Sequence, residues 1–306
     1  MVAEPKYSFW REAFKVPWTM YGIDIKYKLN SVIFYFSQQG STKKIAEKIA
    51  EGLRHGGHTC DLVRFTKISK DLELIKYFEF KRYQLIGFGT PVYYFHPPYH
   101  LFEIFEALPD LSHAKGFLFC TSGGNPGATL FKIKQVLDKK GIKIIDGCDR
   151  WKGFDQHRCY SHFPQSALPS SVGHPTEDEL KQAKEWGSAL IAKALAPNTP
   201  EKTDFWSKDN KWAEGGWKGR SAPFMEKWFP DFYLNKDKCT QCGECAERCP
   251  VEAIVLNPYP TWVKDCDRCY LCDLYCPEQA IECDWSKQIA FMDAILERAK
   301  KKKRLK

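Results

Sequence analysis

Eight of the 13 cysteines in this 306-residue chain fall into two runs of the same form, Cys-x2-Cys-x2-Cys-x3-Cys-Pro. The runs occupy residues 239–250 and 266–277, and a short hydrophobic spacer separates them. Three closely spaced thiolates can wrap one face of an iron–sulfur cube, while a fourth must approach from elsewhere. The sequence therefore predicts iron–sulfur chemistry, with the metal ligands Cys239, Cys242, Cys245, Cys249, Cys266, Cys269, Cys272 and Cys276.

Two other uses of the eight cysteines fit less well. Zinc sites take four ligands per ion, commonly from two Cys-x2-Cys pairs, rather than two runs of four that each end in Cys-Pro. A disulfide framework belongs to secreted proteins. The N-terminus has no cationic start followed by an apolar core, so we expect no secretory signal.

Over about residues 231–283 the chain resembles the two-cluster bacterial ferredoxins, whose cysteine runs share this spacing. In that family, three cysteines of one run and the last cysteine of the other run hold each 4Fe–4S cluster. The resemblance implies that Cys239, Cys242, Cys245 and Cys276 hold one cluster. It implies that Cys266, Cys269, Cys272 and Cys249 hold the second.

A second candidate site follows a buried apolar strand that we expect at residues 31–36. Residues 37–42 combine hydroxyl side chains with a glycine, and a helical pattern begins directly after them. A strand, a loop of this kind and a helix N-terminus can bind phosphate, because N–H groups and the helix dipole converge on an anion. A plain strand-to-helix turn with a capping serine or threonine has the same sequence features. The loop alone leaves both interpretations open.

Strands and helices continue to alternate to about residue 195. Further strands are expected near residues 58–65, 83–89, 116–120 and 143–147, and helices near residues 70–78, 99–108, 128–140 and 177–194. This alternation predicts an α/β fold with a doubly wound, five-stranded parallel sheet. Ligands of such sheets bind at the carboxyl ends of the strands. Two more unusual loops, residues 90–95 and 121–127, follow predicted strand ends.

With these loops, residues 31–195 resemble a flavodoxin-like domain, a fold that binds FMN at this edge of its sheet. The resemblance implies that the first loop holds the FMN phosphate and that the other two flank the isoalloxazine ring. Gln39 departs from the Thr-Gly-Asn-Thr pattern of many relatives, although glutamine can still donate a hydrogen bond. By position, the FMN site comprises Ser37, Gln39, Gly40, Ser41, Thr42, Pro91, Val92, Tyr93, Tyr94, Ser122, Gly123 and Gly124.

The predicted organisation has five segments. Residues 31–196 form the flavodoxin-like FMN domain, and residues 231–284 form a small α+β ferredoxin domain with two 4Fe–4S clusters. Residues 1–30 and 197–230 are rich in aromatic side chains, unlike disordered tails or flexible linkers, so we expect an arm and a linker that pack on the domains. Residues 285–306 are expected to form a helix and a basic tail.

Charge is distributed unevenly along the chain. The net charge is +8, but residues 231–283 contain ten acidic and five basic residues, which gives this stretch −5 and the remainder +13.

No apolar run approaches the roughly 18 residues that span a bilayer, and cluster thiolates suit a reducing compartment. We therefore expect a cytoplasmic protein with no membrane span and no nucleic-acid partner.

Over about residues 31–283 the chain resembles flavodoxin–ferredoxin fusion proteins of anaerobic and facultative microbes. The resemblance implies an electron-transfer protein with FMN and two 4Fe–4S clusters that exchanges low-potential electrons with redox protein donors and acceptors. One alternative is a flavin-dependent reductase with its own small-molecule substrate and the clusters as an internal wire. Another is nucleic-acid or membrane association through the basic tail. The opposite charges of the two lobes also predict a head-to-tail homodimer, against the alternative of a monomer whose lobes serve different partners.

Overall fold

A computed structural model describes most of the two predicted domains. The described residues are 28–93, 95–153, 158, 171–205, 230–263 and 266–304. Nearly all of the N-terminal arm, Tyr94 and most of the aromatic linker lie outside the described residues.

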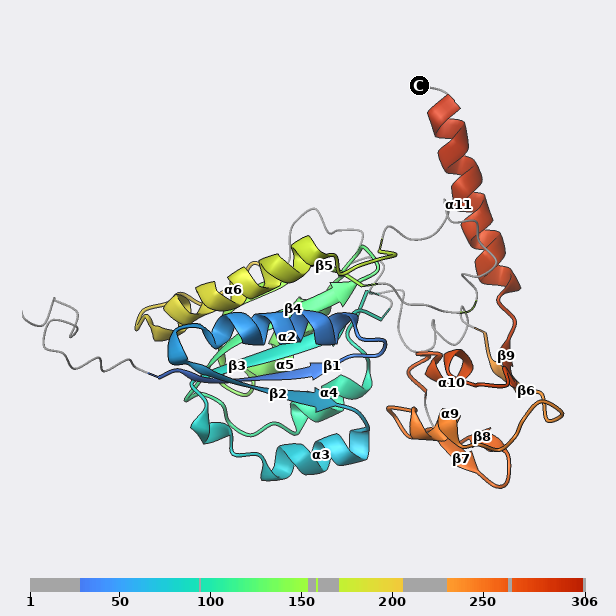
Figure 1. Ribbon diagram of the computed structural model, residues 1–306, viewed down its shortest axis with the longest axis horizontal. Coiled ribbons are helices and arrows are strands. Elements are labelled where there is room, and N and C mark those ends of the chain that lie inside the picture. The colour runs from blue at the N-terminus through green and yellow to red at the C-terminus, as the bar shows by residue number, and fades with distance from the viewer. Residues whose placement is uncertain are drawn as a thin grey trace, which may run out of the picture.

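The first domain, which we call the sheet domain, is built on a five-stranded parallel sheet with the strand order β2-β1-β3-β4-β5 (Figure 1). The strands are β1 (Asn30–Phe36), β2 (Thr59–Phe65), β3 (Leu85–Pro91), β4 (Lys115–Ser122) and β5 (Lys143–Lys152). After β2 the chain crosses back over β1 to add β3, so the switch in winding direction lies between β1 and β3. The predicted doubly wound sheet is confirmed.

Helices cover both faces of this sheet. One face packs against α2 (Ser41–Leu53) and α6 (Glu177–Leu195), and the other against α3 (Ile68–Tyr77), α4 (His100–Glu106) and α5 (Thr129–Asp138). Successive strand residues point to opposite faces, which is why Ile33 packs with α2 while Phe34 packs with α3 and α4. Two short 3-10 segments, η2 (His55–Gly57) and η3 (Phe80–Arg82), precede β2 and β3.

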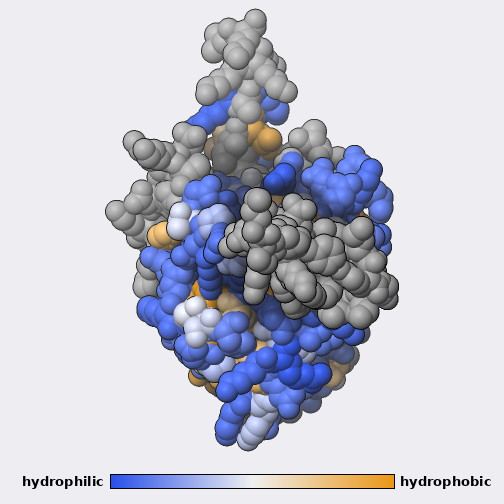
Figure 2. Space-filling model, turned by 90° about the vertical axis from the view of Figure 1, so that its left-hand side faces the viewer, coloured by the Kyte–Doolittle hydropathy of each residue, from blue (hydrophilic) through white to orange (hydrophobic). Residues whose placement is uncertain are grey.

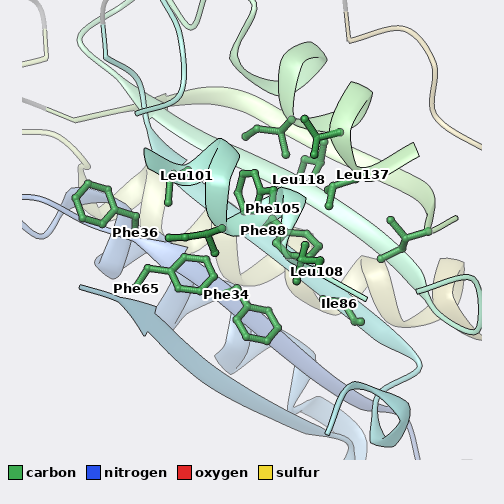
Figure 3. Packing of buried hydrophobic residues seen from close by; sticks show 14 of the residues in the cluster. Phe34, Phe36, Phe65, Ile86, Phe88, Leu101, Phe105, Leu108, Leu118 and Leu137 are labelled. Atoms are coloured by element: carbon green, nitrogen blue, oxygen red, sulfur yellow. The ribbon is translucent and has the colours of Figure 1, made fainter. Parts of the chain in front are cut away.

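Aromatic rings fill the core on the α3–α4–α5 side, as the packed side chains in Figure 3 show. The ring of Phe34 stacks on Phe65 and Phe88 with centroids 5.7 and 5.9 Å away. Phe105 of α4 meets Phe88 edge to face at 5.5 Å. Burying each such side chain contributes about 1.5–3 kcal/mol, so the strand ends that carry the predicted FMN loops rest on a well-packed core.

On the other face, α2 and α6 approach each other at two glycines. A methyl group at Gly52 would collide with the backbone of Lys184, and one at Gly187 would collide with the backbone of Ile49. This close approach fixes α2, the helix whose first turn follows the proposed phosphate loop.

Strand β5 runs to Lys152, five residues beyond the predicted end. Its extension pairs Trp151 with Thr121 and Lys152 with Ser122 after a register shift in the β4–β5 ladder. Trp151 is fully buried against α6 through Trp186, with ring centroids 5.3 Å apart. The prediction missed this part because polar residues interrupt the apolar run after Gly147.

The second domain, which we call the cysteine domain, contains small antiparallel strand pairs and short helices. Strand β6 (Phe232–Leu234) pairs with β9 (Ile281–Cys283), and β7 (Ile254–Leu256) pairs with β8 (Pro260–Trp262). The helices are α9 (Glu244–Glu247), α10 (Leu271–Leu274) and α11 (Ser286–Arg304). The predicted α+β character is confirmed, and α11 projects away from both domains in Figure 1.

The cysteine domain lies beside the carboxyl ends of the strands, toward which the arrowheads point in Figure 1. Figure 2 shows the opposite end of the molecule, where the described surface is mostly hydrophilic. Three cysteine-domain residues, Cys269, Leu271 and Tyr275, pack with the hydrophobic core of the sheet domain. The functional loops of the sheet domain therefore face the cysteine domain.

Candidate functional site: a loop cavity beside two cysteine groups

A cavity of about 390 Å³ opens at the carboxyl ends of β1, β3 and β4. Its lining comes from all three predicted FMN loops, so the fold brings these loops together as expected. The lining residues are Ser37, Gln38, Gln39, Ser41, Thr42, Pro91, Val92, Tyr93, Thr121, Gly123 and Gly153.

The first loop has the geometry and electrostatics of an anion site. Gly40 adopts φ 102° at the N-cap of α2 and has no side chain to cap the helix, and the first N–H groups of a helix lack intrahelical partners. The first turn contains no acidic residue and includes Lys43 and Lys44. Arg64 Nη2 donates to the carbonyl oxygen of Ser37 at 2.9 Å. Positive charge thus surrounds a helix N-terminus, the arrangement that binds phosphate.

Two predicted phosphate ligands also brace the loop. Ser37 Oγ accepts a hydrogen bond from the N–H of Lys43 at 3.1 Å, and its side chain is buried. The hydroxyl groups of Thr42 and Thr121 lie 2.8 Å apart in a buried position. These bonds hold the first loop closed on α2 and tie it to the end of β4.

The second loop is fixed by backbone hydrogen bonds. Tyr93 and His96 exchange N–H···O bonds of 2.7 and 2.9 Å, and Val92 N–H donates to the carbonyl of Thr121 at 2.9 Å. Burial lowers the pKa of His96 to about 3, so its imidazole is neutral at physiological pH. The loop therefore offers a stiff and uncharged wall, which suits a flat aromatic ligand.

Some predicted FMN residues lie outside the lining. Gly40, Ser122 and Gly124 are set back from the cavity, and Ser122 Oγ accepts from the N–H of Gly124 at 3.3 Å, so it shapes the third loop. Tyr94 lies outside the described residues.

Four residues were missed by the sequence prediction. Gln38 and Thr121 adjoin predicted residues, whereas Gly153 reaches the cavity only because β5 is longer than expected. Ser171 is fully buried, and its Oγ lies 3.8 Å from the position that a Cβ on Gly123 would take. Among the described residues this hydroxyl has no hydrogen-bond partner, so it is free to bond a ligand beside the third loop. Nothing in the local sequence marks it.

The first cysteine group lines a separate cavity of about 370 Å³ in the cysteine domain. It contains Cys239, Cys242 and Cys245 of the first run together with Cys276, the last cysteine of the second run. Leu256, Pro260 and Ile281 form part of the apolar wall. Cys245 interacts electrostatically with Cys242 and Cys276, so one thiol of the second run crosses to the first.

The second cysteine group shows the reciprocal exchange. Cys266, Cys269 and Cys272 each interact electrostatically with Cys249, the last cysteine of the first run. Burial, above all, raises the pKa of Cys266 to about 11 and those of Cys269 and Cys272 well above the ordinary thiol value. Four thiols so close together, three of them buried, ionise readily when a bound cation compensates their charge, as iron does in a cluster.

Backbone conformation repeats between the two runs. Left-handed φ values occur at Gln241 within the first run and at Glu252 just after it. They occur again 27 residues later, at Arg268 within the second run and at Gln279 just after it. These turns aim N–H groups at sulfur: Ala253 donates to Cys249 Sγ, and Ala280 to Cys276 Sγ, both at 3.2 Å. N–H groups directed at ligating sulfurs tune iron–sulfur clusters.

Within the described parts of the chain, no three His, Cys, Asp or Glu side chains are placed to hold one metal ion. The thiols of the first group instead surround a cavity, as ligands of a larger cluster do. Of the cysteines outside the two runs, Cys60, Cys120 and Cys148 are buried in the sheet domain, and Cys159 lies outside the described residues.

Protein-family profiles match parts of both domains. A flavodoxin domain profile matches residues 32–156, and a 4Fe-4S binding domain profile matches residues 232–255, which include the first cysteine run. The chain joins a flavodoxin domain to a 4Fe–4S domain. A flavodoxin domain implies FMN and a 4Fe–4S domain implies at least one cluster, so together they support a flavin and iron–sulfur electron-transfer role.

Solved structures resemble the flavodoxin domain. An archaeal flavodoxin is 17% identical over 55% of this chain and all of its own, with a TM-score of 0.38. Oxidised flavodoxin 2 from Bacillus cereus is 18% identical over 54% of this chain and 99% of its own, with a TM-score of 0.40. A flavodiiron protein from Giardia intestinalis is 18% identical over 54% of this chain, with a TM-score of 0.39. This chain covers only 36% of that last protein's length. No curated protein matches the chain.

None of the described helices of this flavodoxin–4Fe–4S chain combines the length and the apolar character that a membrane crossing requires.

Proposed function

We propose that the protein carries low-potential electrons between FMN and two 4Fe–4S clusters and exchanges them with separate redox proteins. The contact between the two domains is the observation that carries this proposal. Gln38, in the wall of the FMN-loop cavity, donates from Nε2 to the carbonyl oxygen of Cys269 at 2.6 Å. Two cofactor sites joined through one side chain suit electron passage within one chain better than two independent activities.

Residue roles follow the site geometry. FMN would be held by Ser37, Gln39, Gly40, Ser41, Thr42, Pro91, Val92, Tyr93, Tyr94, Ser122, Gly123 and Gly124, with Gln38, Thr121, Gly153 and Ser171 added from the structure. One cluster would be held by Cys239, Cys242, Cys245 and Cys276, and the other by Cys249, Cys266, Cys269 and Cys272. The crossed grouping of the thiols supports two clusters, and FMN would exchange one or two electrons while each cluster passes one.

The head-to-tail homodimer remains a prediction. It rests on the opposite charges of the two lobes, and a second copy would also bring a cluster domain close to a flavin held apart from its own clusters. The described contacts place the 4Fe–4S domain against the flavodoxin domain of the same chain, so the pairing would have to rest on charge and apolar contact alone. Sedimentation at several protein and salt concentrations tests it.

Anaerobic rapid mixing separates electron carriage from the reductase alternative. The chemically reduced holoprotein is mixed with an oxidised redox protein, such as a ferredoxin, and in parallel with small-molecule flavin-reductase substrates. We expect single-electron reduction of the protein acceptor and no multiple turnover of a small molecule. Sustained turnover of one small substrate, with no transfer to protein acceptors, would overturn the proposal and favour the reductase.

A further inference from the structure

The residues that dock the two domains gather around one of the two cysteine groups. His100, at the start of α4, places Nδ1 2.5 Å from Oδ2 of Asp267, and both side chains are buried. Asp267 lies directly after Cys266, and Gln38 bonds the carbonyl of Cys269. These contacts hold the second cysteine run against the loops that follow β1 and β3.

A second set of contacts reaches the remaining member of the same group. The N–H of Ile68 donates to the carbonyl of Pro250, next to Cys249, at 2.8 Å. Ser69 Oγ donates to Glu252 at 2.8 Å, and Lys67 pairs with Glu247 at 3.0 Å. The start of α3 therefore holds the chain around Cys249, which joins the group of Cys266, Cys269 and Cys272.

Burial divides the two groups in the same way. In the group of Cys249, three of the four cysteines are buried and Cys266 is half-buried, and Cys269 packs with the core of the flavodoxin domain. In the other group only Cys245 is buried, whereas Cys242 is exposed and Cys239 and Cys276 are half-buried. Arg158 also bonds the carbonyl of Cys276 at 3.0 Å, so this group touches the flavodoxin domain at its crossing cysteine.

We propose that the two clusters act in a fixed order. The inner cluster, held by Cys249, Cys266, Cys269 and Cys272, exchanges electrons with the flavin, and the outer cluster, held by Cys239, Cys242, Cys245 and Cys276, exchanges them with the partner. This order rests on the proposed function. In the delivering direction each step moves one electron: the reduced flavin loses it to the inner cluster, the inner cluster passes it to the outer one, and an oxidised redox protein accepts it.

The face around the outer cluster suits a redox protein with a basic contact surface. Leu256 lines the outer cavity and is 41% exposed, beside Val255 at 48% exposed. Glu244 and Glu278 line the same cavity, and residues 231–283 carry a net −5. A small apolar contact within an acidic field suits a brief encounter that complementary charge steers.

Gln38 is the positioning residue of the inner step. Its side chain lines the flavin-loop cavity and bonds the backbone of a ligand of the inner cluster. The bond joins residues 231 positions apart in the sequence and connects the wall of the flavin-loop cavity to the second cysteine run. A glutamate here would keep the size of the side chain. Its carboxylate could not donate to the carbonyl oxygen of Cys269 and would be repelled by it.

Freeze-quench EPR with single-cluster variants tests the order. Wild type, Cys242→Ser and Cys269→Ser proteins are purified anaerobically with FMN, their iron and flavin contents are measured, and the flavin is reduced photochemically. We expect the fast appearance of a reduced-cluster signal to survive in Cys242→Ser, which then fails to reduce a protein acceptor. We expect Cys269→Ser to lose the fast phase.

The reverse pattern, with the fast phase lost in Cys242→Ser and kept in Cys269→Ser, would overturn the order while leaving the proposed function intact. No cluster reduction in the wild type would refute the proposed function itself.

Gln38→Glu keeps all eight cysteines and therefore tests the order even if a cysteine variant fails to fold. We expect unchanged iron content, a several-fold slower flavin-to-cluster phase, and faster amide hydrogen exchange at residues 267–272. The matched control is Gln84→Glu. The side-chain amide of Gln84 bonds the backbone of Asn30 and of Arg82, both within the flavodoxin domain. Equal rates and equal exchange in Gln38→Glu and wild type would show that this contact does not position the inner cluster.

Discussion

Replacing Gly40 by alanine tests the phosphate loop of the FMN site. Gly40 adopts φ 102° and ψ −15°, a left-handed conformation that costs an L-residue roughly 1–2 kcal/mol. A Cβ at this position would have no protein atom within 4 Å, so steric crowding within the protein is not the cause. The apo loop can relax to relieve the strain, whereas the loop that grips a phosphate must keep this conformation.

The expected loss of affinity follows from that strain. Because 1.4 kcal/mol corresponds to a tenfold change, the Kd for FMN should rise by about 5- to 30-fold in Gly40→Ala. Titrating FMN into the apoprotein while following the quenching of flavin fluorescence measures this change.

Gly57 provides a matched control. It has φ 87°, again with nothing within 4 Å of an added Cβ, and it lies in η2 between α2 and β2, outside the cavity lining. Gly57→Ala should lower stability by a similar amount and leave the Kd for FMN unchanged. Wild-type affinity in Gly40→Ala, or an equal loss in both variants, would refute the assignment of this loop to the phosphate.

Other substitutions probe the clusters, the cofactor and a buried acid. Cys249→Ser should lower the iron content from about eight per chain to about four or fewer, whereas Cys283→Ser should leave it unchanged in an iron and sulfide assay. The extracted flavin should be FMN rather than FAD by chromatography, because one phosphate cradle lines the cavity. Burial raises the pKa of Asp71 to about 6, so the folded state favours the protonated form. This stability contribution is lost as pH rises through 6, by about 1–2 kcal/mol between pH 5 and pH 8. Asp71→Asn, which keeps an acceptor for the Thr66 N–H, should lack this pH dependence in denaturant titrations.

Local features of the sequence predicted most of the site. The spacing of the cysteines in each run predicts which thiols can reach one cluster, because the cysteines and the turn residues between them lie within a few positions of each other. The FMN loops were recognisable because each directly follows a strand, and parallel strands end at one edge of the sheet. Both predictions depend on short stretches whose geometry neighbouring residues dictate.

Tertiary contacts could not be predicted from local sequence features. The bond from Gln38 to Cys269 depends on how two folded surfaces meet, and neither residue's neighbours indicate it. Gly153 reaches the cavity only through the extension of β5, and Ser171 lies beside Gly123, 48 positions earlier in the sequence. The buried pair of His100 and Asp267 likewise joins a helix start to a cysteine run 167 positions away.

Counting the electrons that one chain accepts tests the central claim most directly. An anaerobic coulometric titration, with flavin absorbance and cluster EPR recorded together, should show about four electrons per chain, two for FMN and one for each of the two clusters. Both signals should change in the same molecules and reverse when an oxidised redox protein is added. A total of about two electrons, confined either to the flavin or to the two clusters, would contradict a chain that passes electrons from one cofactor to the other.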